Sequence, residues 1–163
     1  MAKIEINPAL EKYLMELTRF EKDSPEIAKE IVMAGAQPLA DEIRNGIESL
    51  PGDVFRRLTE GEEFSGLPSG SRKDLLNNFG IAPPGVDKNG NTNTKVGFKG
   101  YGSYPTKKYP KGLPNALLAR AIESGSSVRK KSPFVRKAVN KKRKIAIEKM
   151  QEKIEEKIKI YAL

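Results

Sequence analysis

Side chains that could do acid–base, nucleophilic or metal chemistry are few in this 163-residue chain. It holds no histidine and no cysteine, so the commonest general base, the commonest metal ligand and every thiolate are missing. Serine hydroxyls gather at Ser124–Ser127 without a histidine to activate them. Carboxylates gather at Glu60–Glu63 in one short run, without the spaced oxygen ligands that a divalent cation needs. We therefore expect neither an enzyme nor a metal site.

The glycine-rich stretch Gly97–Gly102 does not indicate a nucleotide site either. It looks like a phosphate-binding loop only in its glycines, because no following helix and no Gly-Lys-Ser or Gly-Lys-Thr ending accompanies it. Gly125 follows a short apolar segment and is explained by closure of a helix. We expect no cofactor.

The stretch Gly100–Gly112, which we call the arm, combines three tyrosines, three lysines, two prolines and three glycines. Interleaved tyrosine and lysine could stack on nucleic acid and neutralise it. They equally suit a protein-binding arm, because tyrosine is enriched at interface cores, and a mobile loop without a partner is the third alternative. We favour the protein-binding arm, since long loops in compact domains are usually functional or disordered. Its expected contact residues are Tyr101, Tyr104, Lys107, Lys108 and Tyr109.

A basic run near the C-terminus is the second candidate surface. Its members are Arg136, Lys137, Lys141, Lys142, Arg143 and Lys144. Clustered Lys and Arg on a helix are the electrostatic footprint of phosphate contact. No recognised nucleic-acid motif accompanies them, so they predict sequence-independent contact with double-stranded DNA rather than readout of bases.

Charge is divided unevenly along the chain. Residues 1–64 hold eight Lys/Arg against fourteen Asp/Glu, whereas residues 65–163 hold twenty-two against seven, and the net charge is +9. Such polarity favours either nucleic-acid contact at the basic end or subunits that stack acidic face on basic face. An uneven solvated surface is the plain alternative. Length fits a single domain over residues 1–163, and without a signal-like or membrane-length apolar run we expect an intracellular protein outside the membrane.

The elements that must position these surfaces begin with a helical region over residues 8–60. Apolar spacing at Leu10, Tyr13, Leu14 and Leu17 predicts a helix over residues 8–20. Ser24-Pro25 predicts the start of a second helix, which Pro51-Gly52 ends. Within it we expect Pro38 to kink or split the rod and Gly35 to let a neighbouring element approach closely. One more helical turn is expected near residues 54–58, before a polar link over residues 61–71.

Strand signals follow, with the β-hairpin and arm together spanning residues 75–112. Alternating apolar residues around an Asn89-Gly90 turn predict a hairpin over residues 75–99. Helices are predicted over residues 114–124 and 133–161, the second opened by Ser132-Pro133. The fold class is therefore α+β: N-terminal helices, a small antiparallel or mixed sheet with a hairpin, and a long C-terminal helix.

Three short segments carry a family resemblance. They are residues 74–78 (Asp-Leu-Leu-Asn-Asn), 122–127 (Ile-Glu-Ser-Gly-Ser-Ser) and 131–139 (Lys-Ser-Pro-Phe-Val-Arg-Lys-Ala-Val). Their order, within a match over about residues 25–160, resembles the gene-product-ten-like neck and tail-completion proteins of long-tailed, lambda-type siphophages. The chain departs from the family pattern at Ser124, where an aromatic residue is usual, and at Lys137, where a second proline is usual.

The resemblance implies a non-enzymatic virion protein, present in the host cytoplasm during assembly. Its copies would form a ring, expected to be a hexamer, between the head-completion or connector protein and the tail-tube or tail-terminator proteins. Packaged double-stranded DNA passing through the ring would be contacted without sequence preference. A closed ring needs two different surfaces on each subunit, which the arm and the charge asymmetry could supply. The alternative function is a basic, non-sequence-specific nucleic-acid-binding protein.

Overall fold

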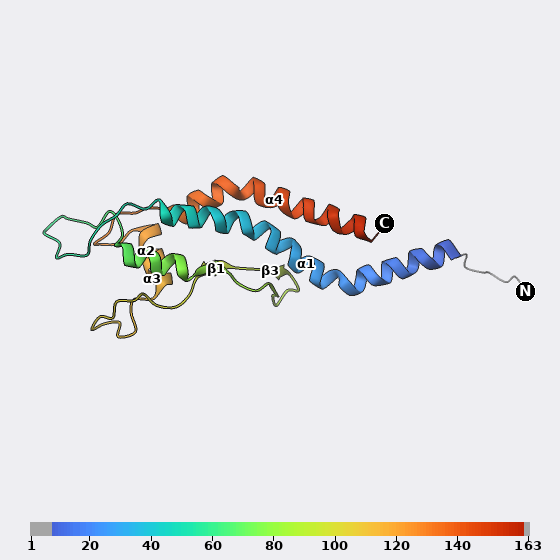
Figure 1. The fold of residues 1–163 in the computed structure, drawn as a ribbon, viewed down its shortest axis with the longest axis horizontal. Helices are drawn as coiled ribbons and strands as arrows, with labels where there is room; N and C mark the ends of the chain where they lie inside the picture. Colours follow the sequence, from blue (N-terminus) through green and yellow to red (C-terminus); the bar gives the residue numbers. More distant parts are fainter. Residues whose placement is uncertain (1–7, 162–163) are drawn as a thin grey trace, which may run out of the picture.

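The computed structural model describes residues 8–161 as an elongated α+β fold (Figure 1). Two long helices, α1 (Pro8–Glu48) and α4 (Phe134–Ile160), pack against each other along most of α4. The short helices α2 (Ser69–Asn77) and α3 (Asn115–Ser124) and the strands lie on one side of this pair, and α1 runs on past the end of α4 (Figure 1). The predicted α+β class is confirmed. No helix in residues 8–161 is both long enough and apolar enough to cross a membrane.

Helix α1 is continuous where the sequence predicted two helices. Pro25 and Pro38 both lie inside it, and the Ser24 hydroxyl donates to the Glu21 carbonyl (2.9 Å) within the helix instead of capping a new one. An interior proline costs a helix about 3 kcal/mol. Packing on both sides of Pro25 offsets that cost: Ile27 is buried, and Phe20 meets the ring of Tyr161 edge to face at 5.3 Å. Tertiary contacts therefore override the local stop signal. The side chains of Leu10 and Tyr13 lie outside the described part.

Two glycines of α1 set its distance from α4. A Cβ at Gly35 would lie 2.7 Å from Met150 Cγ and 3.3 Å from the Ala146 carbonyl oxygen. A Cβ at Gly46 would lie 3.3 Å from Phe134 Cβ. The predicted close approach at Gly35 is thus confirmed, and α4 is the element that approaches.

The hydrophobic core lies where the two long helices meet the short elements. Its buried side chains include Ile43, Ile47, Leu50, Leu67, Leu75, Phe79, Leu118, Ile122 and Phe134. These residues come from all four helices, the first strand and the chain between α1 and α2. The core therefore stabilises the end of the molecule from which the arm projects (Figure 1).

The predicted hairpin is present, with a later start. Strand β1 (Phe79–Ile81) pairs antiparallel with β4 (Val96–Phe98), and β2 (Gly85–Val86) pairs antiparallel with β3 (Thr92–Asn93). At the tip, Asp87 Oδ1 accepts the N–H groups of Asn89 (2.8 Å) and Asn91 (2.9 Å), which lowers the pKa of that carboxyl. Gly90 adopts a left-handed φ of 81°, as the Asn-Gly signal indicates.

Residues 49–77 differ most from expectation. The expected turn of helix near residues 54–58 is absent, so the helical region does not reach residue 60, and residues 69–77 form α2 where a polar link and the start of a strand were expected. The chain instead pairs with itself across a loop: Leu67 donates its N–H to the Pro51 carbonyl (2.9 Å), and Asp53 donates to the Leu67 carbonyl (3.2 Å). This pairing buries Leu67 almost completely.

Helices α3 and α4 lie where the sequence predicted them. Gly125 ends α3 with φ 78°. Pro133 stands at the N-cap of α4 without a side-chain cap bond from its own position, and the Glu123 carboxylate of α3 accepts the first free N–H groups of α4 instead. The expected Ser-Pro start is thus completed by a residue from the preceding helix.

Candidate functional site

The arm is an ordered projection rather than an open loop. At its base Gly102 donates its N–H to the Leu113 carbonyl (2.8 Å) and Asn115 donates to the Gly100 carbonyl (3.1 Å), so the two ends of the arm lie together. At its tip Thr106 donates to the Tyr109 carbonyl (2.9 Å), and the Thr106 hydroxyl accepts the Tyr109 N–H (3.0 Å). The arm is thus closed by backbone hydrogen bonds at both ends.

A glycine makes the close crossing at the base possible. Gly112 adopts φ 95°, and a Cβ there would collide with the Gly102 carbonyl oxygen. A left-handed φ is strained for any residue with a side chain, so conformation and space both require glycine at this position.

Helix α2 anchors one side of the arm. The Asp74 carboxylate accepts the Ser103 N–H (2.8 Å) and the Ser103 hydroxyl (2.6 Å). The Tyr104 ring lies over Gly70, where a Cβ would collide with the phenol oxygen. Glycine in the first turn of α2 therefore leaves the space that the Tyr104 side chain occupies.

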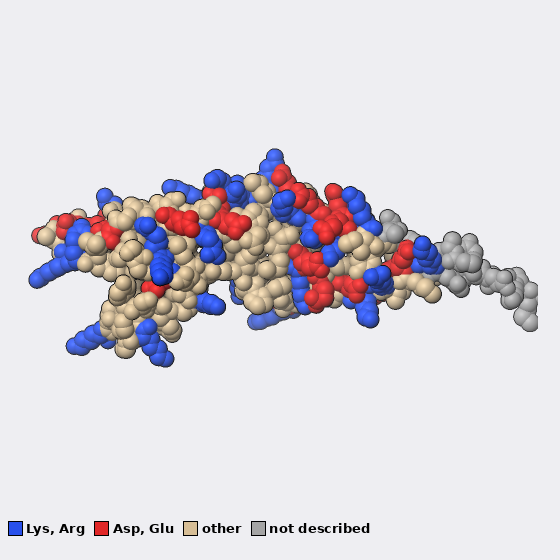
Figure 2. Space-filling model, in the orientation of Figure 1, with Lys and Arg blue, Asp and Glu red and all other residues tan. Residues whose placement is uncertain are grey.

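Of the five arm residues predicted to make contacts, four are exposed. Tyr101 keeps 54% and Tyr104 61% of its surface exposed, and Lys107 and Lys108 are exposed as well. Tyr109 is half-buried, with the Lys108 ammonium 5.5 Å from its ring centroid. In Figure 2 the projecting arm carries Lys side chains and no acidic ones. The arm thus presents aromatic and cationic groups together.

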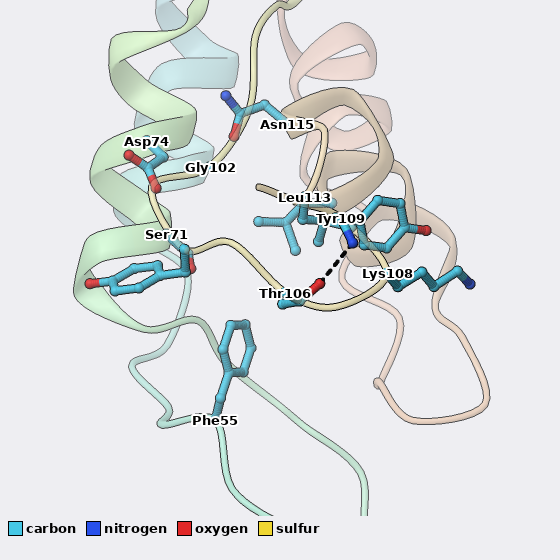
Figure 3. A pocket seen from close by; sticks show the side chains of 11 residues that line it. Phe55, Ser71, Asp74, Gly102, Thr106, Lys108, Tyr109, Leu113 and Asn115 are labelled. Carbon is cyan, nitrogen blue, oxygen red and sulfur yellow. Dashed lines mark hydrogen bonds between the residues drawn. The ribbon is translucent and has the colours of Figure 1, made fainter. Parts of the chain in front are cut away.

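A cavity of about 390 Å³ lies between the arm, α2 and the start of α3. Its walls are mainly apolar and come from separate parts of the chain. Figure 3 shows Phe55 from the loop before α2 and Tyr109 and Leu113 from the arm and its base, and Leu118 of α3 completes the apolar lining. Ser71, Asp74 and Lys108 add polar groups to the lining. Among the arm residues that the sequence singled out, the structure brings Tyr104, Lys108 and Tyr109 to this cavity and leaves Tyr101 and Lys107 outside its lining.

Two polar residues that line this cavity are buried, Ser71 and, more deeply, Asn115. Asn115 is fully buried, and its Nδ2 donates to the Lys99 carbonyl (3.0 Å). Its Oδ1 is also buried and accepts no hydrogen bond from the described part of the chain. Figure 3 shows this oxygen on the side of the amide that faces Gly102. Buried acceptors without a donor are rare in folded proteins.

The basic run lies on the first half of α4, and part of its charge is neutralised within the chain. Glu42 of α1 pairs with Lys141 (2.7 Å) and with Lys142 (3.6 Å). The hydrogen bond from Lys141 lowers the pKa of Glu42. Acidic and basic side chains accordingly interleave over the long helices on the face that Figure 2 shows.

The other four members of the run differ in their neighbours. The Arg136 guanidinium lies 4.0 Å from Glu123, and the Lys144 ammonium lies 4.0 Å from Glu148. Lys137 and Arg143 are exposed and form no ion pair among the described residues. Acidic residues of the N-terminal part and basic residues of the C-terminal part thus meet within one molecule.

Sequence reasoning missed Phe55, Asp74 and Asn115 as parts of the site. Asp74 belongs to a segment quoted only for its resemblance, and Phe55 was expected in a helical turn. Asn115 follows Pro114 at a helix start, a place where Asn usually signals a cap, and this was the available clue.

No known family, curated protein or solved structure matches this chain. The resemblance of its three short segments to phage neck and tail-completion proteins therefore stays a prediction.

Proposed function

We propose that this chain is a structural protein of the phage head–tail interface, a neck or tail-completion component rather than an enzyme. Its copies would form a ring, of six by the family resemblance, between the connector or head-completion protein and the tail tube or its terminator. The virion is then its place of action and the host cytoplasm its place of assembly.

The observation that carries this proposal is the ordered, exposed arm. A loop that is hydrogen-bonded at base and tip and anchored to Asp74 presents Tyr101 and Tyr104 to solvent without collapsing onto the core. Large exposed aromatic side chains on a rigid support are typical of surfaces that bind another protein. Binding of a partner would cost the arm little conformational entropy, because the arm is already ordered.

A second exposed surface would allow the head-to-tail contacts that a ring requires. Ile147, Ile154 and Ile158 follow one flank of α4 at helical spacing, with 46%, 41% and 43% of their surfaces exposed. This flank differs in kind from the arm, being aliphatic and helical. Two unlike surfaces on one subunit are what a heterologous, closing contact uses.

Electron microscopy of a phage lysate with an early stop codon in this gene tests the proposal. Filled heads separate from tails would support the joining role, and tails of abnormal length would support the terminator role. Complementation with Tyr101→Ala/Tyr104→Ala should fail to restore joining although the purified variant folds. Val86→Ala, another exposed apolar residue on the hairpin, is the matched control and should complement. Intact virions in normal number from the stop-codon phage would refute the proposal.

The alternative function, sequence-independent DNA binding, is favoured by Lys137 and Arg143, which are exposed and form no ion pair among the described residues. Each phosphate contact steepens the fall of log Kobs with log salt by roughly 0.9. Lys137→Ala/Arg143→Ala should therefore flatten that slope by about 2 if α4 contacts the duplex. An unchanged slope would exclude this surface of α4 as a DNA-binding site.

A further inference from the structure

We infer that the outer face of the β1–β4 sheet is the surface with which this chain contacts the phosphate backbone of double-stranded DNA, without sequence preference. The basic run on α4, which the sequence singled out, is then not the contact surface. The inference rests on the proposed function for where the DNA is met, and it deepens that function by naming the side of the subunit that faces packaged DNA. The binding itself is a property of the isolated chain.

The net charge of the chain is carried by the short elements that lie between the two long helices in the sequence. Residues 65–131, which we call the short-element layer, hold twelve Lys/Arg against three Asp/Glu, a balance of +9. The balance of −6 in residues 1–64 and the balance of +6 in residues 132–163 cancel. The short helices and the strands lie on one side of the α1–α4 pair (Figure 1). That side therefore has an uncompensated positive charge, which is typical of a surface that binds a polyanion.

The cations of the short-element layer are not neutralised within the chain. None of them forms an ion pair among residues 8–161, because every ion pair found there takes its cation from α1, α4 or the loop before α2. All are exposed except Arg72 and Arg129, each of which donates to a backbone carbonyl. The carboxylates of the layer accept backbone N–H groups instead, and they are Asp74, Asp87 and Glu123.

A groove of about 600 Å³ on the β1–β4 sheet lets a phosphate backbone come close to this charge. Its floor contains the cross-strand pair Gly80 and Gly97, whereas Phe79 and Phe98 pack together on the opposite face, against the core. A Cβ built at either glycine meets no atom within 4 Å, so the floor is bare backbone open to solvent. Glycine inside a strand often marks a place where a ligand approaches the backbone closely.

Two lysines flank this glycine floor. The strand ladder extends to both of them, because Ala82 donates its N–H to the Lys95 carbonyl (2.7 Å) and Lys99 donates to the Asn78 carbonyl (3.0 Å). Lys95 and Lys99 lie two residues before and after Gly97, so strand alternation places them on the same outer face. Both are exposed, and the described residues that line the groove include no carboxylate. A phosphate backbone laid along the groove would therefore meet an ammonium group at each end.

The chemistry of the outer face favours DNA over an acidic protein as the occupant. Asn78, Gly80, Ala82 and the two lysines supply polar groups, small side chains and bare backbone, without a large apolar side chain to anchor a partner. Protein–protein interfaces have an apolar, often aromatic centre. Protein–DNA interfaces are more polar and much more positively charged, and their affinity comes largely from release of the counterions of the phosphates.

Anisotropy of a fluorescent duplex of random sequence, measured on the purified full chain at several salt concentrations, tests the inference. Lys95→Ala/Lys99→Ala should flatten the fall of log Kobs with log salt by about 2, since each lost phosphate contact removes roughly 0.9. Lys149→Ala/Lys153→Ala is the matched control. It removes the same charge from lysines that α4 already pairs with Glu152 (2.6 Å) and Glu156 (2.8 Å), and it should leave the slope unchanged.

A second variant, Gly80→Thr/Gly97→Thr, probes the groove without removing charge. The open space above both glycines admits the new side chains and threonine favours strands, so the Tm should not fall. The side chains would hold the phosphate backbone away from the floor, so binding of the duplex should weaken severalfold.

An unchanged slope for Lys95→Ala/Lys99→Ala would overturn the inference. Equal flattening by the control would also overturn it, because total charge rather than this face would then decide binding. So would unaltered duplex binding by the threonine variant with its Tm retained. Tighter binding of polyglutamate than of the duplex at the same salt would overturn it too, because the partner would then be an acidic protein. None of these results affects the lysate microscopy, so failure of this inference is distinguishable from failure of the proposed function.

Discussion

The Glu123 carboxylate of α3 accepts the backbone N–H of Val135 (2.8 Å) in the first turn of α4. Its other oxygen accepts the N–H of Arg136 (3.1 Å). These donors have no partner inside α4, because the first N–H groups of a helix point out of its end. A carboxylate there also interacts favourably with the helix dipole. The Glu123 side chain thus caps α4 and links α3 to its N-terminus.

Replacing Glu123 with alanine should lower the free energy of unfolding by about 1–2 kcal/mol, the usual effect of losing an N-terminal cap. Urea unfolding followed by circular dichroism gives the difference. Glu123→Gln keeps an acceptor and should lose less. Glu155→Ala on exposed α4 surface is the control, and equal losses at positions 123 and 155 would contradict the capping role.

Replacing Gly35 with leucine should push α4 away, because even a Cβ at this position lies 2.7 Å from Met150 Cγ. We expect a loss of about 1–3 kcal/mol from overpacking, despite the better helix propensity of leucine. Met150→Ala should restore part of that loss in the double variant. Thermal unfolding of both single variants and the double variant checks the coupling, and strictly additive losses would show that the two residues do not meet.

Replacing Gly112 with alanine should release the arm without unfolding the protein. The left-handed φ of 95° and the nearby Gly102 carbonyl both exclude a side chain there. Trypsin should then cut after Lys107, Lys108 or Lys111 about tenfold faster or more, since cleavage tracks the population of the open form. Gly90→Ala carries similar backbone strain in the hairpin, at φ 81°, and should leave cleavage in the arm unchanged.

Stability at high pH should depend on Tyr161, whose hydroxyl donates to Asp23 (2.6 Å). This hydrogen bond raises the pKa of Tyr161 above its ordinary value of 10.0. The protonated form is therefore favoured by folding, so its contribution is complete below pH 10 and is lost as the pH rises through the folded-state pKa. Urea unfolding of the wild type and Tyr161→Phe between pH 8 and 11 should converge at the alkaline end. Parallel curves would contradict the linkage.

Replacing Glu42 with glutamine should strengthen binding of duplex DNA if α4 contacts it. The substitution removes the carboxylate that pairs with Lys141 and Lys142. Two released lysines should steepen the salt dependence by about 1–2, since each phosphate contact adds roughly 0.9 to the slope. Filter binding at several salt concentrations gives the slope. Lys141→Ala/Lys142→Ala in the same background should reverse the gain, and no change in either variant would exclude a DNA-binding role for these lysines.

The elements that were predictable from the sequence carry local signals. Each of these signals acts over a few residues: Gly125 follows an apolar run, Ser132-Pro133 precedes one, and Asn89-Gly90 lies between two short strands. The break expected at Ser24-Pro25 is absent, because residues distant in the sequence contact α1 on both sides of it: Tyr161 bonds to Asp23 before the proline, and Lys157 pairs with Glu30 after it. Leu75 and Leu76 end a helix rather than begin a strand, since a short apolar run fits either state until its neighbours are known.

The candidate site was predictable in composition but not in shape. Tyrosine and lysine content located the arm, whereas the cavity depends on Phe55, Asp74 and Asn115 meeting across long sequence separations. The bond between Ser103 and Asp74, for example, joins residues 29 positions apart. Periodicity and turn chemistry act over much shorter distances and contain no information about such a meeting.

The antiparallel pairing of α1 with α4 has a consequence for biosynthesis. Glu42 meets Lys141 across 99 residues, and Asp23 meets Tyr161 across 138. A ribosome therefore releases all of α1, with its glycine-bearing face, long before the residues that cover that face exist. The core receives Phe134 and Ala138 equally late. The nascent chain must keep α1 uncovered through most of translation, and the fold is completed only when α4 emerges.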